Sequence, residues 1–324
     1  MYQHFFGFHE LPFELTPNPK YLFLTVRHRE ALSALEYGLS SAKAITVLIG
    51  EAGTGKTTLL QAAIESDRCR GVDKVHLNNP ALTRSEFVEL LARRFGLSRR
   101  AEESKATLLS ELEQVLRERR SRGEIVALVI DEAQSLSAEL LEEIRLLANI
   151  ETPFEKLLPL VLAGQPELRD RLNEPGLRQL KQRVTLRCEI GLLTLDETAS
   201  YIATRVATAG GDPARLFSRE AIVLIHERSH GIPRLINVIC DNALLTGFGI
   251  GRHTIDRTTV LEVTRDFDLA APETQVAAEG PGVDRKAGTI EYTVTAAADA
   301  RIAPDTAEAP ERGSPRRFLF FGAR

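Results

Sequence analysis

The chain alternates short runs of apolar residues with segments in which apolar residues recur at the spacing of a helix. A run of four to eight apolar residues is typical of a buried strand, and longer periodic segments are typical of amphipathic helices. The runs that predict strands lie at residues 44–49, 73–77, 125–130, 158–163 and 184–190. Between them, Thr83 followed by Glu86 has the form of a capping box at a helix N-terminus. Because strands separated by helices are joined by crossover connections, the pattern predicts an α/β fold with a parallel sheet covered by helices.

The flanking segments differ from this alternating part. Residues 1–43 open with aromatic and proline-rich sequence and continue into a predicted helix over 26–39. Residues 193–266 open with a second capping box, Thr194 followed by Glu197, and show helical spacing throughout, which predicts a small all-helical domain. Residues 267–324 are rich in Ala, Pro, Asp, Glu and Gly, and this composition predicts disorder. We therefore expect four parts: an N-terminal extension packing on the ligand site (1–43), an α/β core (44–192), a helical lid (193–266) and a disordered tail (267–324).

The composition of the chain is that of a globular protein. The 324 residues are 43% apolar and 27% charged, which is typical of a globular chain with a substantial core. A net charge of −4 does not favour nucleic acid as a partner. The three cysteines lie far apart without metal-binding spacing and indicate reduced, intracellular thiols. Without a secretory signal or an apolar run near the roughly 20 residues of a membrane span, we expect a cytoplasmic protein, at most peripheral at the inner membrane.

A phosphate-binding loop follows the first predicted strand. Residues 50–57 read Gly-Glu-Ala-Gly-Thr-Gly-Lys-Thr and fill every fixed position of the pattern GxxxxGK[ST]. Glycines let backbone N–H groups close around phosphate oxygens, Lys56 is expected to contact the β- and γ-phosphates, and Thr57 to contact Mg²⁺. A glycine-rich turn without a ligand is the alternative. The residues expected at the nucleotide are Gly50, Glu51, Ala52, Gly53, Thr54, Gly55, Lys56, Thr57 and Thr58.

Two adjacent carboxylates follow the apolar run 125–130. Asp131 and Glu132 end a predicted parallel strand, and ligands of such sheets lie at the carboxyl ends of the strands. Asp131 is expected to hold Mg²⁺ through water, and Glu132 to act as general base for the attacking water. The alternative is a strand that ends in two solvated acids.

Further candidates lie C-terminal to these motifs. Gln165 follows another predicted strand and is suited to orient the water or the γ-phosphate, with an ordinary turn residue as the alternative. The basic segment 178–187 contains several arginines, and a guanidinium suits a phosphoryl-transfer transition state. Spacing does not decide which arginine has this role. Arg234 starts a helix after a Gly-Ile-Pro turn and is suited to contact the γ-phosphate from the lid, with a surface arginine as the alternative.

Taken together, these motifs resemble those of AAA+ ATPases of the general secretion pathway protein A (ExeA-like) type, over about residues 1–266. The resemblance implies a P-loop NTPase core, a helical lid, ATP and Mg²⁺ as ligands, ATP hydrolysis and an oligomer, often a hexameric ring. The matching segments are the phosphate loop 50–57, Asp131-Glu132-Ala133-Gln134, Gly164-Gln165-Pro166-Glu167-Leu168, Gly231-Ile232-Pro233-Arg234 and the opening residues 5–32.

The resemblance also implies roles for single residues. His28 and Arg29 correspond to residues near the adenine. Gln165 stands in the sensor-1 position, where many AAA+ proteins carry Asn or Thr. Arg183 resembles the arginine finger that reaches a neighbouring subunit, and Arg234 resembles sensor 2.

The chain also departs from the secretion-pathway members, which continue into a membrane span and a peptidoglycan-binding domain. Neither follows here, and in length the chain is more similar to relatives associated with exopolysaccharide or exosortase loci. We expect an oligomeric motor or assembly factor for an envelope secretion or exopolysaccharide export system. The alternatives are a DNA-linked regulator of the transposition-helper type, a slow nucleotide switch and a small-molecule kinase.

The C-terminal residues 316–322 place two arginines beside a cluster of large apolar residues. This composition predicts a contact with a partner protein or with the membrane surface, strengthened when many copies act together. Folding back onto the chain's own domain is the alternative.

Overall fold

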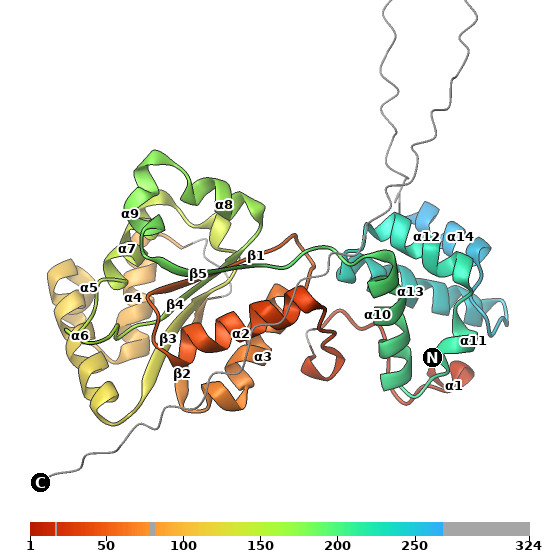
Figure 1. Ribbon diagram of the computed structural model, residues 1–324, viewed down its shortest axis with the longest axis horizontal. Coiled ribbons are helices and arrows are strands. Elements are labelled where there is room, and N and C mark those ends of the chain that lie inside the picture. Colours follow the sequence, from red (N-terminus) through yellow and green to blue (C-terminus); the bar gives the residue numbers. More distant parts are fainter. Residues whose placement is uncertain (17, 78–81, 268–324) are drawn as a thin grey trace, which may run out of the picture. The chain divides into compact units, whose positions relative to one another are not determined.

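The computed structural model describes residues 1–16, 18–77 and 82–267, and its centre is a five-stranded parallel sheet (Figure 1). The strands in spatial order are β2 (Val72–Leu77), β3 (Ile125–Ile130), β4 (Leu160–Gly164), β1 (Ile45–Ile49) and β5 (Val184–Glu189). All four neighbouring pairs are parallel, as predicted. The fourth strand begins two residues later than the sequence indicates, because Pro159 has no N–H group to donate to the ladder.

Helices cover both faces of the sheet, which explains why its central strands are wholly apolar. Successive side chains of a strand point to opposite faces, so Val47 and Ile49 belong to one core and Leu48 to the other. The helices on the Leu48 face are α2 (Val26–Ser40) and α3 (Lys56–Glu65). Those on the other face are α4 (Arg84–Phe95), α6 (Lys105–Ser121), α7 (Ala138–Leu147), α8 (Pro166–Leu172) and α9 (Arg178–Lys181), with α5 (Arg99–Glu103) packed on α4 and α6.

A helical domain follows the sheet, as predicted. Its helices are α10 (Leu195–Thr208), α11 (Pro213–Leu216), α12 (Arg219–Ser229), α13 (Pro233–Gly249) and α14 (Arg257–Asp266), and they share one apolar core. The predicted capping boxes are confirmed: Thr83 and Thr194 each accept a hydrogen bond from the backbone N–H of the glutamate three residues later, whose carboxylate bonds back.

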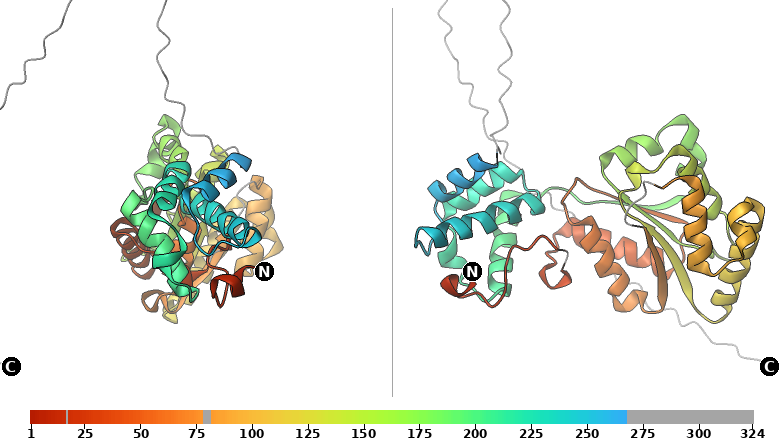
Figure 2. Two further views of the ribbon diagram at one scale, coloured as in Figure 1. Left: turned by 90° about the vertical axis from the view of Figure 1, so that its right-hand side faces the viewer. Right: turned by 180° about the vertical axis from the view of Figure 1, so that it is seen from behind.

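The first residues of the chain pack into this helical domain. Helix α1 (Gln3–Phe6) lies at the helical domain (Figures 1 and 2), where Phe5 packs against Phe248 of α13 and against His253. Tyr2, Phe8 and Phe13 are buried in the apolar core of the lid. The Tyr2 hydroxyl donates a hydrogen bond to Asp241 of α13. Residues 1–13 therefore belong physically to the lid, although they precede the α/β core in sequence.

Arg205 of α10 fixes the N-terminal segment to the lid. It is 7% exposed, and its guanidinium donates hydrogen bonds to the carbonyl oxygens of Pro12 (2.6 Å) and Glu14 (3.3 Å) and to the Tyr201 hydroxyl (3.0 Å). The guanidinium also lies 4.6 Å from the ring centroid of Tyr21. A buried cation is tolerated when its donors are satisfied in this way.

Replacing Arg205 with alanine is expected to lower the free energy of unfolding by about 2–4 kcal/mol, because buried carbonyl oxygens lose a charged donor. For a domain of this size the melting temperature should fall by roughly 5–10 °C. Thermal unfolding followed by circular dichroism measures the change. Arg215→Ala is the control, because the Arg215 side chain is 87% exposed and its ion pair contributes little. Equal melting temperatures for the two variants would contradict this role of Arg205.

The described residues, up to Phe267, form one compact unit. The proposed internal boundaries after residues 43 and 192 stay predictions. The predictions for the tail, including the contact through residues 316–322, concern residues outside the described part. Within the described part, every helix is too short or too polar to cross a membrane.

Candidate active site

The phosphate loop joins β1 to α3, whose first residue is Lys56. Gly53 and Gly55 have φ angles of 78° and 96°, which residues with a Cβ rarely adopt. A Cβ on Gly53 would also lie 2.7 Å from the Cβ of Arg234, whose backbone N–H donates to the Gly53 carbonyl oxygen (3.2 Å). Glycine at position 53 thus permits both the turn of the loop and its contact with the lid.

Lys56 is directed into its own loop. Its Nζ donates hydrogen bonds to the carbonyl oxygens of Gly50 (2.9 Å) and Glu51 (3.0 Å). Burial lowers the pKa of Lys56, although the carboxylates of Glu132 and Asp131 oppose this shift. A triphosphate offers this desolvated ammonium stronger partners than two neutral carbonyl oxygens.

Thr57 and Asp131 meet at the carboxyl edge of the sheet. The Thr57 hydroxyl donates a hydrogen bond to Oδ2 of Asp131 over 2.5 Å, although the two residues are 74 positions apart. A hydroxyl and a carboxylate that converge beside a phosphate loop are the oxygen donors that Mg²⁺ accepts together with substrate phosphates. These two residues therefore fit the predicted Mg²⁺ site.

Glu132 is held by two amides. Its Oε2 accepts hydrogen bonds from the side-chain nitrogens of Gln134 (2.6 Å) and Gln165 (3.2 Å), while Oε1 accepts none from a described residue. Burial acts to raise the pKa of Glu132, but the two amides and the Lys56 charge outweigh it and hold the pKa below its ordinary value. The backbone of Glu132 is left-handed, with φ of 52°, and such strain is common at functional sites. The carboxylate is thus ionised, fixed in place and open on one oxygen.

Gln134 is itself fixed from two directions. Its Oε1 accepts the backbone N–H of Gln165 (3.1 Å), and its carbonyl oxygen accepts a hydrogen bond from the Arg171 guanidinium. Gln134 therefore links the loop after β3 to the loop after β4, and through both it positions Glu132.

For the ATP hydrolysis that the sequence predicts, replacing Gln134 with leucine is expected to lower kcat about tenfold, which corresponds to the loss of one hydrogen bond that orients Glu132. The KM for ATP should change little, because Gln134 does not line the cavity. Steady-state phosphate release measures both constants. Gln114→Leu is the control, since Gln114 is exposed on α6 and bonds only Glu118. A rise in KM at unchanged kcat would contradict the positioning role.

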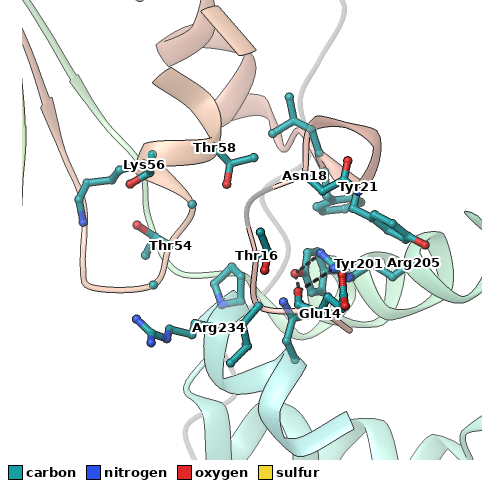
Figure 3. Close-up of a pocket in the computed structure, with 18 of the residues that line it drawn as sticks. Glu14, Thr16, Asn18, Tyr21, Thr54, Lys56, Thr58, Tyr201, Arg205 and Arg234 are labelled. Atoms are coloured by element: carbon teal, nitrogen blue, oxygen red, sulfur yellow. Dashed lines mark hydrogen bonds between the residues drawn. The ribbon is translucent and has the colours of Figure 1, made fainter. Parts of the chain in front are cut away.

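A cavity of about 350 Å³ extends from the phosphate loop toward the N-terminal segment and α10. Figure 3 shows Lys56 and Arg234 toward one end of it, and Glu14, Tyr21, Tyr201 and Arg205 gathered at the other. His28 lines the cavity as well and bonds Thr25 Oγ1 (2.8 Å) and the Thr54 carbonyl oxygen (3.4 Å). Burial lowers the pKa of His28, which favours the neutral ring.

The structure brings most of the predicted site residues together. Those that line the cavity are His28, Gly53, Thr54, Gly55, Lys56, Thr57, Thr58, Glu132 and Arg234. Asp131 and Gln165 join them through hydrogen bonds, while Gly50, Glu51 and Ala52 form the base of the loop outside the lining. Arg29 does not line the cavity, because adjacent residues of a helix point about 100° apart, and its guanidinium bonds the Leu24 carbonyl oxygen (3.2 Å). Arg183 does not line it either.

Sequence reasoning missed the polar residues at the far end of the cavity. Tyr201 and Asn237 share a hydrogen bond of 2.9 Å there, and Arg205 and Tyr21 adjoin them. The available signal was the spacing of Tyr201 and Arg205, four residues apart and therefore on one face of the predicted helix. The residues next to Tyr21 in the sequence carry no pattern which indicates that this segment contacts Tyr201 and Arg205.

Comparison with known protein sequences gives two findings. A family described as an AAA domain matches residues 39–172. General secretion pathway protein A of Aeromonas hydrophila is 38% identical over 273 residues, which cover 84% of this chain and 48% of the relative, so the chain spans about half the length of that relative.

Solved structures share the fold. The ORC2 protein of Aeropyrum pernix, described in ADPNP–ADP complexes, superposes with a TM-score of 0.61 at 17% identity and covers 80% of this chain and 72% of that one. Cdc6p from Pyrobaculum aerophilum has a TM-score of 0.59 at 18% identity, with 79% and 70% covered. At these identities the likeness concerns the fold alone.

Proposed function

Because the chain belongs to the AAA+ P-loop proteins and is related to general secretion pathway protein A, we propose that it binds ATP with Mg²⁺ and hydrolyses ATP. The observation that carries this proposal is the convergence of Lys56, the Thr57–Asp131 pair and the ionised Glu132 on one cavity. The AAA+ fold predicted from the sequence is confirmed.

Each residue has a defined task in this proposal. Lys56 exchanges its two loop carbonyls for the β- and γ-phosphates, and the loop N–H groups bind the remaining phosphate oxygens. Thr57 and Asp131 would hold Mg²⁺, which would supply positive charge to neutralise the negative charge of the phosphates. Glu132 accepts the proton of the attacking water on Oε1 while Gln165 and Gln134 keep its orientation. Arg234 contacts the γ-phosphate from the lid.

The proposed active form of the protein is an oligomer. The position of Arg183 outside its own cavity supports a role in the cavity of a neighbouring copy, as an arginine finger requires. The relation to general secretion pathway protein A supports an assembly or motor function for an envelope secretion or exopolysaccharide export system. A contact through residues 316–322 would bring the oligomer to its partner or to the membrane surface.

Lys56→Ala tests the nucleotide site directly. The loss of charge-assisted hydrogen bonds to the phosphates is expected to weaken binding of a fluorescent ATP analogue about 10- to 100-fold. Lys74→Ala is the control, because Lys74 is exposed on β2. Equal affinities for the two variants would contradict the proposed site. Binding of labelled duplex DNA that weakens as salt is added would instead favour a DNA-linked regulator. The net charge of −4 does not lead us to expect such binding.

A further inference from the structure

One aromatic side chain of the α/β core is almost entirely exposed. Phe154 lies in the connection from α7 to β4 and is 95% exposed, the highest exposure among the large apolar side chains of the described residues. A protruding aromatic ring offers a large apolar area that can be buried against another molecule.

The turn that presents Phe154 is rigid. Residues 152–155 read Thr-Pro-Phe-Glu, and proline fixes the backbone at the second position of a turn. The Thr152 backbone N–H donates to the Glu155 carbonyl oxygen (2.8 Å), and Thr152 Oγ1 accepts from the N–H groups of Phe154 (3.2 Å) and Glu155 (3.1 Å). Phe154 is therefore held outward without a further loss of backbone entropy on binding.

Ion pairs fix the base of the same turn. Arg120 bonds the Glu155 carboxylate, Lys156 bonds that of Glu151, and Arg117 donates to the Glu151 carbonyl oxygen (3.2 Å). These contacts tie the turn to helix α6, so it moves with the α/β core as one body.

The turn lies beside Arg183. Helix α7 leads into the turn and packs against α9, which ends two residues before Arg183. The pKa of Glu151 in the turn is lowered by its bond to Lys156 and, more weakly, by the charge of Arg183. Helix α9 carries the exposed side chains of Arg178 and Lys181. A basic surface with one protruding aromatic ring is suited to an acidic partner that has an apolar depression.

Such a depression adjoins the nucleotide cavity. It has a volume of about 430 Å³ and is lined by Thr25, Val26, Arg27, Glu30, Gly191, Leu192, Thr194 and Glu197. Its apolar side chains Val26 and Leu192 are 62% and 44% exposed. Its carboxylates, Glu30 and Glu197, outnumber its one cation, Arg27, so the excess charge of the lining is negative and complements a basic surface. Thr25 bonds His28, and Leu192 precedes Leu193; both His28 and Leu193 line the nucleotide cavity. The depression and the nucleotide cavity are thus neighbours.

From these contacts we infer that Phe154 inserts into the depression around Val26 and Leu192 of a second copy of this chain and thereby brings Arg183 to that copy's nucleotide. The inference rests on the proposed function, because it takes the oligomer and the role of Arg183 from there. The surface with Phe154 differs from the surface that receives it, so the contact is head-to-tail and is compatible with a ring.

The test uses the Glu132→Gln protein with ATP, because this variant is expected to bind ATP without hydrolysing it. Self-association of the protein is measured by sedimentation velocity over a series of protein concentrations. Phe154→Ala in this background is expected to raise the dissociation constant at least tenfold, about 1.4 kcal/mol. Phe267→Ala is the control, because Phe267 is half exposed at the end of the lid. ATP binding by dilute protein and the melting temperature should stay unchanged, since the exposed ring stabilises neither.

Unchanged association of Phe154→Ala would overturn this inference and leave the proposed function standing. If the Glu132→Gln protein itself stays monomeric with ATP at every concentration, the proposed oligomer fails and the inference fails with it.

A second measurement tests whether the depression of one copy receives Phe154 of another copy. Phe154→Cys protein and Val26→Cys protein are mixed with ATP and a short bismaleimide, with the unmutated cysteines as background. A cross-link that needs both variants and ATP supports the head-to-tail contact. A cross-link formed by Phe154→Cys alone, or the absence of any cross-link between the two, contradicts it.

Discussion

Glu132→Gln is expected to lower the kcat of ATP hydrolysis about 100- to 10,000-fold, the range over which a general base accelerates a reaction. Glutamine cannot accept the proton of the attacking water. Its side-chain oxygen still accepts the hydrogen bonds from Gln134 and Gln165, so the loop should keep its conformation. ATP affinity should change only a few-fold, because Lys56 and Thr57 are untouched.

Two assays separate these expectations: phosphate release at saturating ATP, and titration with a fluorescent ATP analogue. Glu139→Gln is the matched control, since Glu139 is an exposed glutamate in the first turn of α7. If the Glu132→Gln protein hydrolyses ATP within twofold of the rate of the unmutated protein, Glu132 is not the general base. Near-zero turnover in the unmutated protein, with ATP still bound, would favour the slow nucleotide switch.

Arg183→Ala is expected to lower kcat about 1,000-fold or more, the lower end of what an arginine finger contributes. The loss concerns the transition state, because a guanidinium from outside the cavity meets charge that develops on the γ-phosphate. The KM should therefore change much less than kcat. In the proposed oligomer Arg183 acts at the site of a neighbouring copy, so the defect should be repaired by mixing.

The mixing experiment combines Arg183→Ala with Glu132→Gln protein. A site on an Arg183→Ala subunit retains Glu132 and receives Arg183 from a Glu132→Gln neighbour, so about a quarter of the sites in an equal mixture regain every group. Arg178→Ala and Arg187→Ala are the controls, because the sequence does not decide among the arginines of this segment. Full loss of activity in one of these, with Arg183→Ala active, would move the finger to that residue. Loss in Arg183→Ala without recovery on mixing would contradict action in trans.

The sequence predicts the parts of this fold that depend on local pattern. Strands such as 125–130 are buried on both faces and are apolar throughout, and the phosphate loop needs glycine at fixed positions for its backbone angles. These signals lie within a few neighbouring residues. For the same reason the lid helices could be predicted from spacing and from the capping box at Thr194.

Contacts between distant segments were not predictable from such patterns. The packing of Phe8 and Phe13 into the lid depends on a surface formed almost 200 residues later, and neither residue carries a sign of it. The role of Gln134 depends on the way two loops meet at the sheet edge. The helix that carries His28 was predicted, but which of its residues faces the cavity was settled only by the rotation of that helix on the sheet.

We propose that each site of ATP hydrolysis is completed by a residue from a second copy of this chain. The most direct measurement is ATP turnover per protomer as a function of protein concentration, with Glu132→Gln protein in parallel. We expect turnover per protomer to rise steeply with protein concentration to a plateau, and this rise to be absent in the Glu132→Gln protein. Turnover that is high and independent of concentration down to the most dilute sample would mean that one chain holds a complete site, and would contradict the account.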